Sequence, residues 1–221
     1  MFINVALVHS AADVVPLLED VAREVMADVE LVHMVDEGIE RMVDQAGGLT
    51  EPVTRRIVTQ VTNAHEAGAE AVMLASPVIG SAIDAVRSVT TVPVVRIDRA
   101  MAEAAVQLGS AIGVLAGGQV NLQATLALLR DCSDALDKPV DFETALCPEV
   151  EQALRLADLD AYDRAVVHGI EGLADNDMVV LADVMMHRVA HIAGDRVHVP
   201  VLTSPKHGFE HLAKKLNYFR R

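Results

Sequence analysis

Short apolar runs alternate with longer amphipathic stretches along the whole chain. Each apolar run ends at polar or turn-forming residues, and the stretches between the runs repeat apolar positions at helical spacing. This alternation is typical of parallel sheets flanked by helices, so the pattern predicts an α/β fold. The predicted strands are residues 3–8, 29–35, 70–75, 93–97, 110–115, 139–146, 178–182 and 199–203. The predicted helices include residues 53–67, 81–88, 98–108, 121–132, 158–174 and 205–216.

The second half of the chain repeats the strand pattern of the first half. Three pairs of apolar segments agree on one shift of 107 residues: Val5–Val8 with Ile112–Leu115, Ala71–Ser76 with Met178–Asp183, and Val92–Val95 with Val199–Leu202. An internal repeat of this kind predicts two pseudo-symmetric halves, each a mainly parallel sheet flanked by helices. We place the first half at residues 1–97 plus 205–221 and the second half at residues 98–204.

The polar residues that follow the predicted strands are the first candidates for a functional site. In parallel sheets, ligands bind at the carboxyl ends of the strands, where helix N-termini present free N–H groups. Two halves that face each other would share an interdomain cleft at these ends, and the shift of 107 makes Ser76 and Asp183 equivalent. The residues at these strand ends are His9, Ser10, Ser76, Gly117, Gly118, Asp183, Ser204 and His207.

Composition and charge narrow the classes of partner. Hydrophobic residues make up 52% of the chain. No apolar run approaches the roughly 20 residues that cross a bilayer, and the first residues lack a basic flank and a cleavage site. We therefore expect a cytoplasmic protein with no membrane partner. We expect no nucleic-acid partner, because binding to nucleic acid needs positive charge and aromatic stacking surfaces, whereas this chain has a formal charge of −14 and 3% aromatic residues.

Nine segments occur in the order and spacing of a known family: Ala6–His9, Val35–Gly38, Gly48–Thr50, Leu74–Gly80, Val94–Met101, Ile112–Ala116, Leu159–Asp163, Val179–Ala182 and Val199–Pro205. Together they resemble the aspartate/glutamate/hydantoin racemase superfamily over nearly the whole chain. In that superfamily, each half supplies a cysteine to a central cleft. The resemblance implies a cofactor-independent enzyme that acts at the carbon next to the carboxylate of a small acid. It also implies a homodimer.

The chain departs from this family at the two positions where the cysteines are expected. Ser76 stands at the first position and Asp183 at the second. A two-base racemase uses a thiolate and a thiol on opposite faces of the reacting carbon, because a thiol pKa lies within a few units of neutrality. A serine hydroxyl is far less acidic, so Ser76 would need an activating partner. The sequence therefore does not support symmetric racemisation of the cysteine type.

Asp183 and Ser76 remain the candidate catalytic residues. A carboxylate in a closed cleft can have its pKa raised towards neutrality and act as a one-sided acid or base, which suits decarboxylation, elimination or isomerisation. In the related arylmalonate decarboxylases, one of the two cysteines is likewise absent. The alternative for both residues is a helix N-cap, and for Ser76 a hydroxyl that caps or binds substrate is preferred over a nucleophile. The neighbouring substrate-binding candidates are Pro77, Val78, Ile79, Val184 and Met185.

Further polar residues complete the predicted site. We expect His9 and Ser10 at one strand end and His207 beyond the last strand to bind substrate. Packing or hydrogen bonding is the alternative for His9, as it is for His33 within a strand. Asn121 lies where the family tends to have threonines that help to hold a carboxylate, and an N-cap is its alternative. The two cysteines, Cys132 and Cys147, are interpreted as packing residues that activity does not need.

A metal site and a dinucleotide site are both weakly supported. Asp183, His187 and His191 recur every four residues, a spacing that can place zinc ligands on one helix. A third ligand eight residues along drifts by about 80° around the helix, which is poor for one tetrahedral site. Gly117-Gly118 lacks the full Gly-x-Gly-x-x-Gly spacing. We therefore predict no metal and no cofactor.

Three hypotheses for the function follow. The first is a racemase-like isomerase or lyase, the second a non-catalytic protein that binds a small carboxylate, and the third a metal-dependent hydrolase. The sequence does not name the substrate, because side-chain specificity depends on loops such as residues 36–50, whose path cannot be derived from the pattern.

Overall fold

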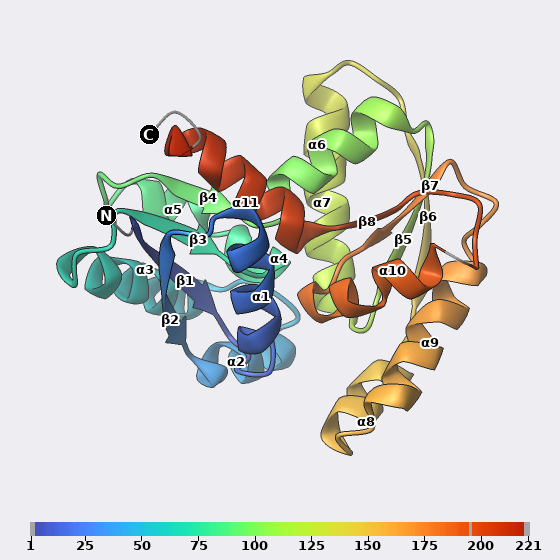
Figure 1. The fold of residues 1–221 in the computed structure, drawn as a ribbon, viewed down its shortest axis with the longest axis horizontal. Coiled ribbons are helices and arrows are strands. Elements are labelled where there is room, and N and C mark those ends of the chain that lie inside the picture. Colours follow the sequence, from blue (N-terminus) through green and yellow to red (C-terminus); the bar gives the residue numbers. More distant parts are fainter. Residues whose placement is uncertain (1–2, 195, 219–221) are drawn as a thin grey trace. The chain divides into compact units, whose positions relative to one another are not determined.

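The computed structural model describes residues 3–194 and 196–218 of the chain (Figure 1). The chain divides into two compact units, Met1–Asp98 with Pro205–Arg221, and Arg99–Ser204. The predicted division after residue 97 differs from this by one residue. Asp98 belongs to the first unit because its fully buried carboxylate accepts two hydrogen bonds from Arg96, at 2.9 and 2.8 Å.

The first unit is a four-stranded parallel sheet in the order β2-β1-β3-β4. The helix α3 packs against β1, β2 and β3, and α1 packs against β2. The last helix, α11, red in Figure 1, returns the chain to this unit. The elements are β1 Ile3–His9, α1 Val15–Val25, β2 Val29–Val35, α2 Glu37–Ala46, α3 Glu51–Glu66, β3 Ala71–Leu74, α4 Pro77–Gly80, α5 Ile83–Arg87, β4 Val94–Arg96 and α11 Ser204–Lys215.

The second unit has the same architecture, a parallel sheet in the order β6-β5-β7-β8. Its helix α7 packs on β5, β6 and α6. The elements are α6 Arg99–Leu108, β5 Ala111–Ala116, α7 Gln119–Ala135, β6 Asp141–Leu146, α8 Glu149–Arg155, α9 Leu159–Glu171, β7 Met178–Leu181, the 3₁₀ helix η1 Val184–Val189, α10 Ala190–Ala193 and β8 Val201–Thr203. In the described part of the chain, no helix combines the length and the apolar character needed to cross a membrane.

The predicted α/β fold with two parallel sheets is confirmed, and all eight predicted strands lie within two residues of the observed ends. The predicted helix 81–88 is wrong in its start. The helical backbone already begins at Pro77, and the segment is split into α4 and α5. Proline is pre-organised for the first position of a helix, and the preceding Ser76 caps it, so the helix starts one turn earlier than its apolar pattern suggests.

The pairing of the strands confirms the repeat of 107 residues. In the first sheet Val5 pairs with Ala71, and in the second Ile112 pairs with Met178 at the same shift. The outer pairs β3·β4 and β7·β8 obey the same shift. The pairs β1·β2 and β5·β6 do not. Val5 pairs with Leu31 and Ile112 with Phe142, so the second unit has four more residues between these strands.

The repeat extends to the polar contacts that begin the central strands. The Glu70 carboxylate accepts a hydrogen bond from the Asn4 N–H at 3.1 Å. Its equivalent Asp177 accepts bonds from the N–H groups of Ser110 and Ala111, at 2.7 and 2.9 Å. The pKa of Asp177 lies below its usual value, mainly because these backbone N–H groups stabilise the carboxylate. Each unit thus fixes the start of its central strand with one carboxylate.

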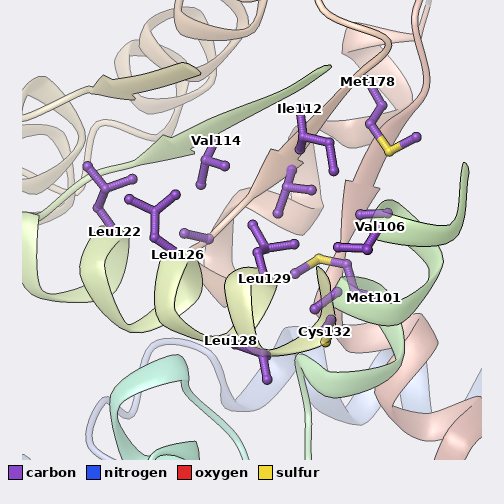
Figure 2. Close-up of a cluster of buried hydrophobic side chains, with 14 of the residues drawn as sticks. Met101, Val106, Ile112, Val114, Leu122, Leu126, Leu128, Leu129, Cys132 and Met178 are labelled. Carbon is purple, nitrogen blue, oxygen red and sulfur yellow. The ribbon is translucent and has the colours of Figure 1, made fainter. Parts of the chain in front are cut away.

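The core of the second unit is apolar and contains the first cysteine. Along α7, the side chains of Leu122, Leu126, Leu129 and Cys132 lie against β5 and the helix α6 (Figure 2). Cys132 is almost fully buried in this cluster. The interpretation of Cys132 as a packing residue is therefore confirmed.

Lys138 caps the carboxyl end of α6, and its loss is expected to destabilise the second unit. Its Nζ donates to the carbonyl oxygens of Val106, Gln107 and Gly109 at 2.7, 3.1 and 2.8 Å. Charge-assisted bonds at a half-buried position contribute modestly, so Lys138→Met should lower the free energy of unfolding by about 1 to 3 kcal/mol. Urea denaturation of the variant measures this value. Lys214→Met, at an exposed position of α11, is the control, and an equal loss in both variants would contradict the capping role.

Candidate functional site

Each sheet has a point where the strand order reverses, between β1 and β3 in the first unit and between β5 and β7 in the second. In open parallel sheets, ligands bind outside the carboxyl ends of the strands at such a point. The residues that follow these strands are Ser10 and Ser76 in the first unit, and Gly117 and Asp183 in the second. The structure therefore places these predicted residues where the fold forms ligand sites.

Asp183 is held by two hydrogen bonds from the neighbouring strand end. The N–H of Gly117 donates to its Oδ2 at 2.5 Å, and the side-chain amide of Asn121 donates to its Oδ1. Asn121 lies in the first turn of α7, directly after the Gly117-Gly118 turn. The two predicted residues Asp183 and Asn121 are therefore brought together in one cluster.

Neither side chain caps a helix, although Asp183 occupies the N-cap position of η1. The Asp183 side chain makes no capping bond to η1, which follows it. Asn121 is not a cap either, because Gly118 occupies the N-cap position of α7. The sequence pattern allowed a cap because Asp and Asn are common at N-cap positions, but these two side chains instead bond to each other, and Asp183 also bonds to Gly117.

Burial raises the pKa of the Asp183 carboxyl, and the negative charge of Glu151 raises it further. The hydrogen bonds from Gly117 and Asn121 oppose this shift because they stabilise the carboxylate. Burial is the larger effect, so protonated Asp183 persists at higher pH than an ordinary aspartic acid does. A carboxyl group of this kind can donate a proton and take it back.

Gly117 is required by this geometry. A Cβ atom at position 117 would lie 2.5 Å from Val150 Cγ2 and 3.2 Å from Asp183 Oδ2. The absence of a side chain allows the backbone N–H to approach the carboxylate closely. The Gly117-Gly118 turn thus presents a donor to Asp183, and the sequence pattern alone did not predict this role.

Ser76 caps the short helix α4. Its Oγ accepts a hydrogen bond from the Ile79 N–H at 3.2 Å, so the capping alternative for Ser76 is confirmed. The helix start is also held by Arg96, whose Nη2 lies 3.4 Å from the Pro77 carbonyl oxygen and whose guanidinium is paired with buried Asp98. The hydroxyl retains its own proton as a donor.

His9 has both ring nitrogens engaged within the first unit. Its Nδ1 lies 2.7 Å from the Ala11 carbonyl oxygen, and its Nε2 lies 3.0 Å from Nδ1 of His33. The alternative that His9 and His33 are hydrogen-bonding residues is therefore confirmed. The prediction that His9 contacts substrate is untested, and in this state the ring offers no unengaged nitrogen to a ligand.

The remaining candidates lie at or near the strand ends, and their contact with a substrate stays a prediction. Val184 is buried and Met185 half-buried in η1, while Ser10 follows β1 directly and His207 lies half-buried in α11. Pro77, Val78 and Ile79 are buried in α4.

Cys147 follows β6 and is buried. Burial and the nearby Glu149 raise the pKa of its thiol to about 11, so it stays protonated at neutral pH. A catalytic thiol needs the opposite shift, towards the thiolate. The packing interpretation of Cys147 agrees with these surroundings.

The proposed metal ligands do not converge. The segment after Asp183 is a 3₁₀ helix followed by the four residues of α10, so a spacing of four residues does not define one α-helical face. His187 Nδ1 lies 2.6 Å from Thr203 Oγ1, and His191 is exposed. Among residues 3–194 and 196–218, no three His, Cys, Asp or Glu side chains are grouped to hold a metal ion.

A hollow of about 590 Å³ in the first unit was not anticipated from the sequence. It lies between β2 and α3, where Arg56 pairs with Asp36 at 2.8 Å and His33 forms part of the wall. Its residues come from a strand and a distant helix, so no local motif marks them. The region 36–50, whose path the sequence did not reveal, begins at this hollow and forms α2.

The comparisons with known proteins agree with this description. The aspartate racemase of Picrophilus torridus has a TM-score of 0.72 at 13% identity, covering 98% of this chain and 95% of that chain. The allantoin racemase of Pseudomonas fluorescens has a TM-score of 0.63 at 20% identity, with coverage of 100% and 92%. An arylmalonate decarboxylase has a TM-score of 0.61 at 15% identity, with coverage of 96% and 91%. At these identities the likeness establishes the fold alone.

The sequence comparison establishes the family. No curated protein sequence matches the chain. The profile of the family described as Asp/Glu/Hydantoin racemase matches residues 3–212, which is nearly the whole chain. The sequence and fold together therefore show that this protein belongs to the Asp/Glu/hydantoin racemase family.

Proposed function

We propose that the protein is a cofactor-independent enzyme that moves a proton at the carbon next to the carboxylate of a small acid, with Asp183 as the acid or base. The observation that carries the proposal is the Asp183 cluster. A carboxyl group with a raised pKa lies at the carboxyl end of a central strand, oriented by Gly117 and Asn121. The family membership supports a racemase or decarboxylase type of enzyme.

A one-sided reaction fits this chain better than symmetric racemisation. In a decarboxylation, the bond to the departing carboxylate breaks, carbon dioxide leaves, and the electron pair stays on the carbon. Protonated Asp183 then transfers its proton to that carbon and recovers one from water. This sequence needs a single acid, whereas symmetric racemisation needs one on each face. The arylmalonate decarboxylase among the structural neighbours supports a lyase on this fold.

Ser76 has the role of orienting the substrate. Its oxygen accepts the bond that caps α4, which leaves the hydroxyl proton available to donate to a substrate carboxylate. No general base is hydrogen-bonded to this hydroxyl in the described residues, so nucleophilic attack by Ser76 is not part of the proposal. That Ser76 and Asp183 act on one substrate stays a prediction, as does a homodimer in the cytoplasm.

The central test compares Asp183→Asn with Ser76→Ala. The probes are glutamate, aspartate, allantoin and phenylmalonate, assayed for exchange of the α-hydrogen in deuterated water and for release of carbon dioxide. Asp183→Asn should lower kcat by about 10²- to 10⁴-fold, the usual contribution of a general acid or base. Ser76→Ala should lower kcat/KM by only about 2- to 13-fold, because it removes one neutral hydrogen bond.

Asp131→Asn is the matched control, since it makes the same change at an exposed position of α7. If the wild-type protein turns over a probe and Asp183→Asn keeps the full rate, the assignment of Asp183 is wrong. If the wild type binds a probe but neither exchanges nor decarboxylates any of the four, the non-catalytic binding hypothesis replaces the enzyme.

A second prediction tests the pKa of Asp183 through stability. Because burial raises the folded-state pKa above the unfolded value, the unfolded chain ionises first and the folded carboxylate becomes costly. The wild type should therefore lose stability relative to Asp183→Asn as the pH rises from about 4 through the folded pKa, and the difference should then level off. Urea denaturation of both proteins at several pH values measures this, and a gain in relative stability with pH would refute the shift.

A third prediction concerns the donor at Gly117. Gly117→Ala places a methyl group 2.5 Å from Val150 Cγ2 and against the Asp183 carboxylate, so the turn must move. We expect kcat to fall by at least about 10-fold, because the bond that orients Asp183 is lost. Gly117→Ala combined with Val150→Ala removes the larger clash and should recover stability without full activity. Gly172→Ala, with nearest contacts of 3.5 Å, is the control.

A further inference from the structure

A chain of polar contacts crosses the first unit beside the strand ends. It begins at the Ala11 carbonyl oxygen, continues through the imidazole ring of His9 and then that of His33, and ends at Glu19 of α1. The Ala11–His9 contact is 2.7 Å, the contact between His9 Nε2 and His33 Nδ1 is 3.0 Å, and His33 Nε2 lies 3.4 Å from Glu19 Oε1. The two rings meet edge to face, at an interplanar angle of 89°.

Counting donors and acceptors along this chain fixes its protons. A carbonyl oxygen only accepts, so His9 Nδ1 carries a proton. The contact between the two rings needs one proton and one lone pair, so it holds a single proton. The Glu19 carboxylate accepts, so His33 Nε2 carries a proton as well. This assignment of donors and acceptors gives the four ring nitrogens three protons in total, and it is the basis of the proposal below.

In this assignment His33 is the ring with both nitrogens protonated. His9 is 1% exposed, whereas the His33 side chain is 13% exposed and its Nε2 lies 3.4 Å from Oε1 of Glu19, which is itself 41% exposed. Burial lowers the pKa of His9, and the charge of His33 lowers it further. Other charged groups lie nearby: Asp13 acts on His9, and Asp36 and Arg56 line the hollow to whose wall His33 also belongs.

We propose that His33 is a positioning residue for the segment 10–14 at the carboxyl end of β1. It acts through His9, and the two rings together hold three protons. Its donor group holds His9, and His9 in turn holds the carbonyl of Ala11. A fourth proton would place N–H groups on both sides of the His9–His33 contact and break it. Without that contact the His9 ring is no longer tied to β2, so the segment 10–14 is held less firmly when the pH falls.

The importance of this segment for catalysis rests on the proposed function, whereas the proton count does not. β1 pairs with β3, and Ser76 follows β3 at the same end of the sheet as Ser10. A shift of segment 10–14 would therefore disturb the strand ends that the proposed function uses. The experiment below measures the proton count, the mobility of the segment and the activity separately.

The proton count is measured by nitrogen-15 NMR of the imidazole rings in the intact protein. At pH 7, His9 should show one protonated nitrogen, Nδ1, and His33 two. In Glu19→Gln the negative charge that balances the third proton is gone, so the pair should hold two protons. Asp20→Asn, the same type of change on the next residue of α1, should leave three. Two protons in the wild type, or three in Glu19→Gln, would overturn the proposal.

The positioning role is measured by hydrogen exchange of the backbone amides in segment 10–14. His33→Ala removes the donor to His9, so exchange should accelerate by about 2- to 13-fold, the equivalent of one hydrogen bond. His33→Asn keeps an N–H donor near the position of Nδ1, and its amide can turn to accept once His9 Nε2 is protonated, so it should restore protection and abolish the acceleration that acid causes in the wild type. Equal exchange in all three proteins at every pH would refute the role of His33.

The link to catalysis is read from the pH profile of kcat/KM on whichever probe the wild type turns over. The acid side of the profile should move to lower pH in His33→Asn, while kcat at its optimum stays within about 3-fold. An unchanged acid side, together with the expected NMR and exchange results, would show that the segment is positioned without serving the reaction, and it would overturn the catalytic part of the proposal. If turnover is lost in Asp183→Asn while the pH profile of His33→Asn matches the wild type, the proposed function stands and only the catalytic role of His33 fails.

Discussion

The pairing of β5 with β7 is the constraint on which the candidate site depends. The last residue pair between these two strands is Leu115 with Leu181. Two residues further on, at Gly117 and Asp183, both segments have left the sheet. Parallel pairing brings these two positions to the same edge, so the N–H of Gly117 and the Asp183 carboxylate meet although they are 66 residues apart. The first sheet repeats this arrangement, with Val8 paired to Leu74 ahead of Ser10 and Ser76.

The two sheets use this shared geometry for different electrostatics. Beyond β5 and β7, burial and Glu151 favour the neutral form of Asp183. Beyond β1, the His9 ring is held between the Ala11 carbonyl and His33, and Glu19 lies at the far end of these contacts. The strand ends of the first sheet thus carry a hydrogen-bonded histidine pair, and those of the second carry a protonatable carboxyl. The fold supplies equivalent positions, and the side chains decide what each position does.

Local pattern was enough to predict the strands, the repeat and the strand-end residues, because parallel strands carry a strong apolar signal and their ends follow from topology. It was not enough to tell a cap from a partner. Ser76 caps the helix next to it, whereas Asp183 bonds to Gly117 and Asn121, and the sequence offered an N-cap as an alternative for both residues. The contact of His9 with His33 joins two strands, so only the three-dimensional arrangement reveals it.

The division of the chain also sets an order of assembly during synthesis. The second unit is one continuous stretch, Arg99–Ser204, whereas the first unit needs α11, which comes last. Phe209, Leu212 and Ala213 of that helix are fully buried. On the ribosome, the second unit can therefore complete its sheet while the strands of the first unit are not yet covered by α11. The first unit closes only after α11 has emerged, and until then its apolar surface is the part that a chaperone would have to protect.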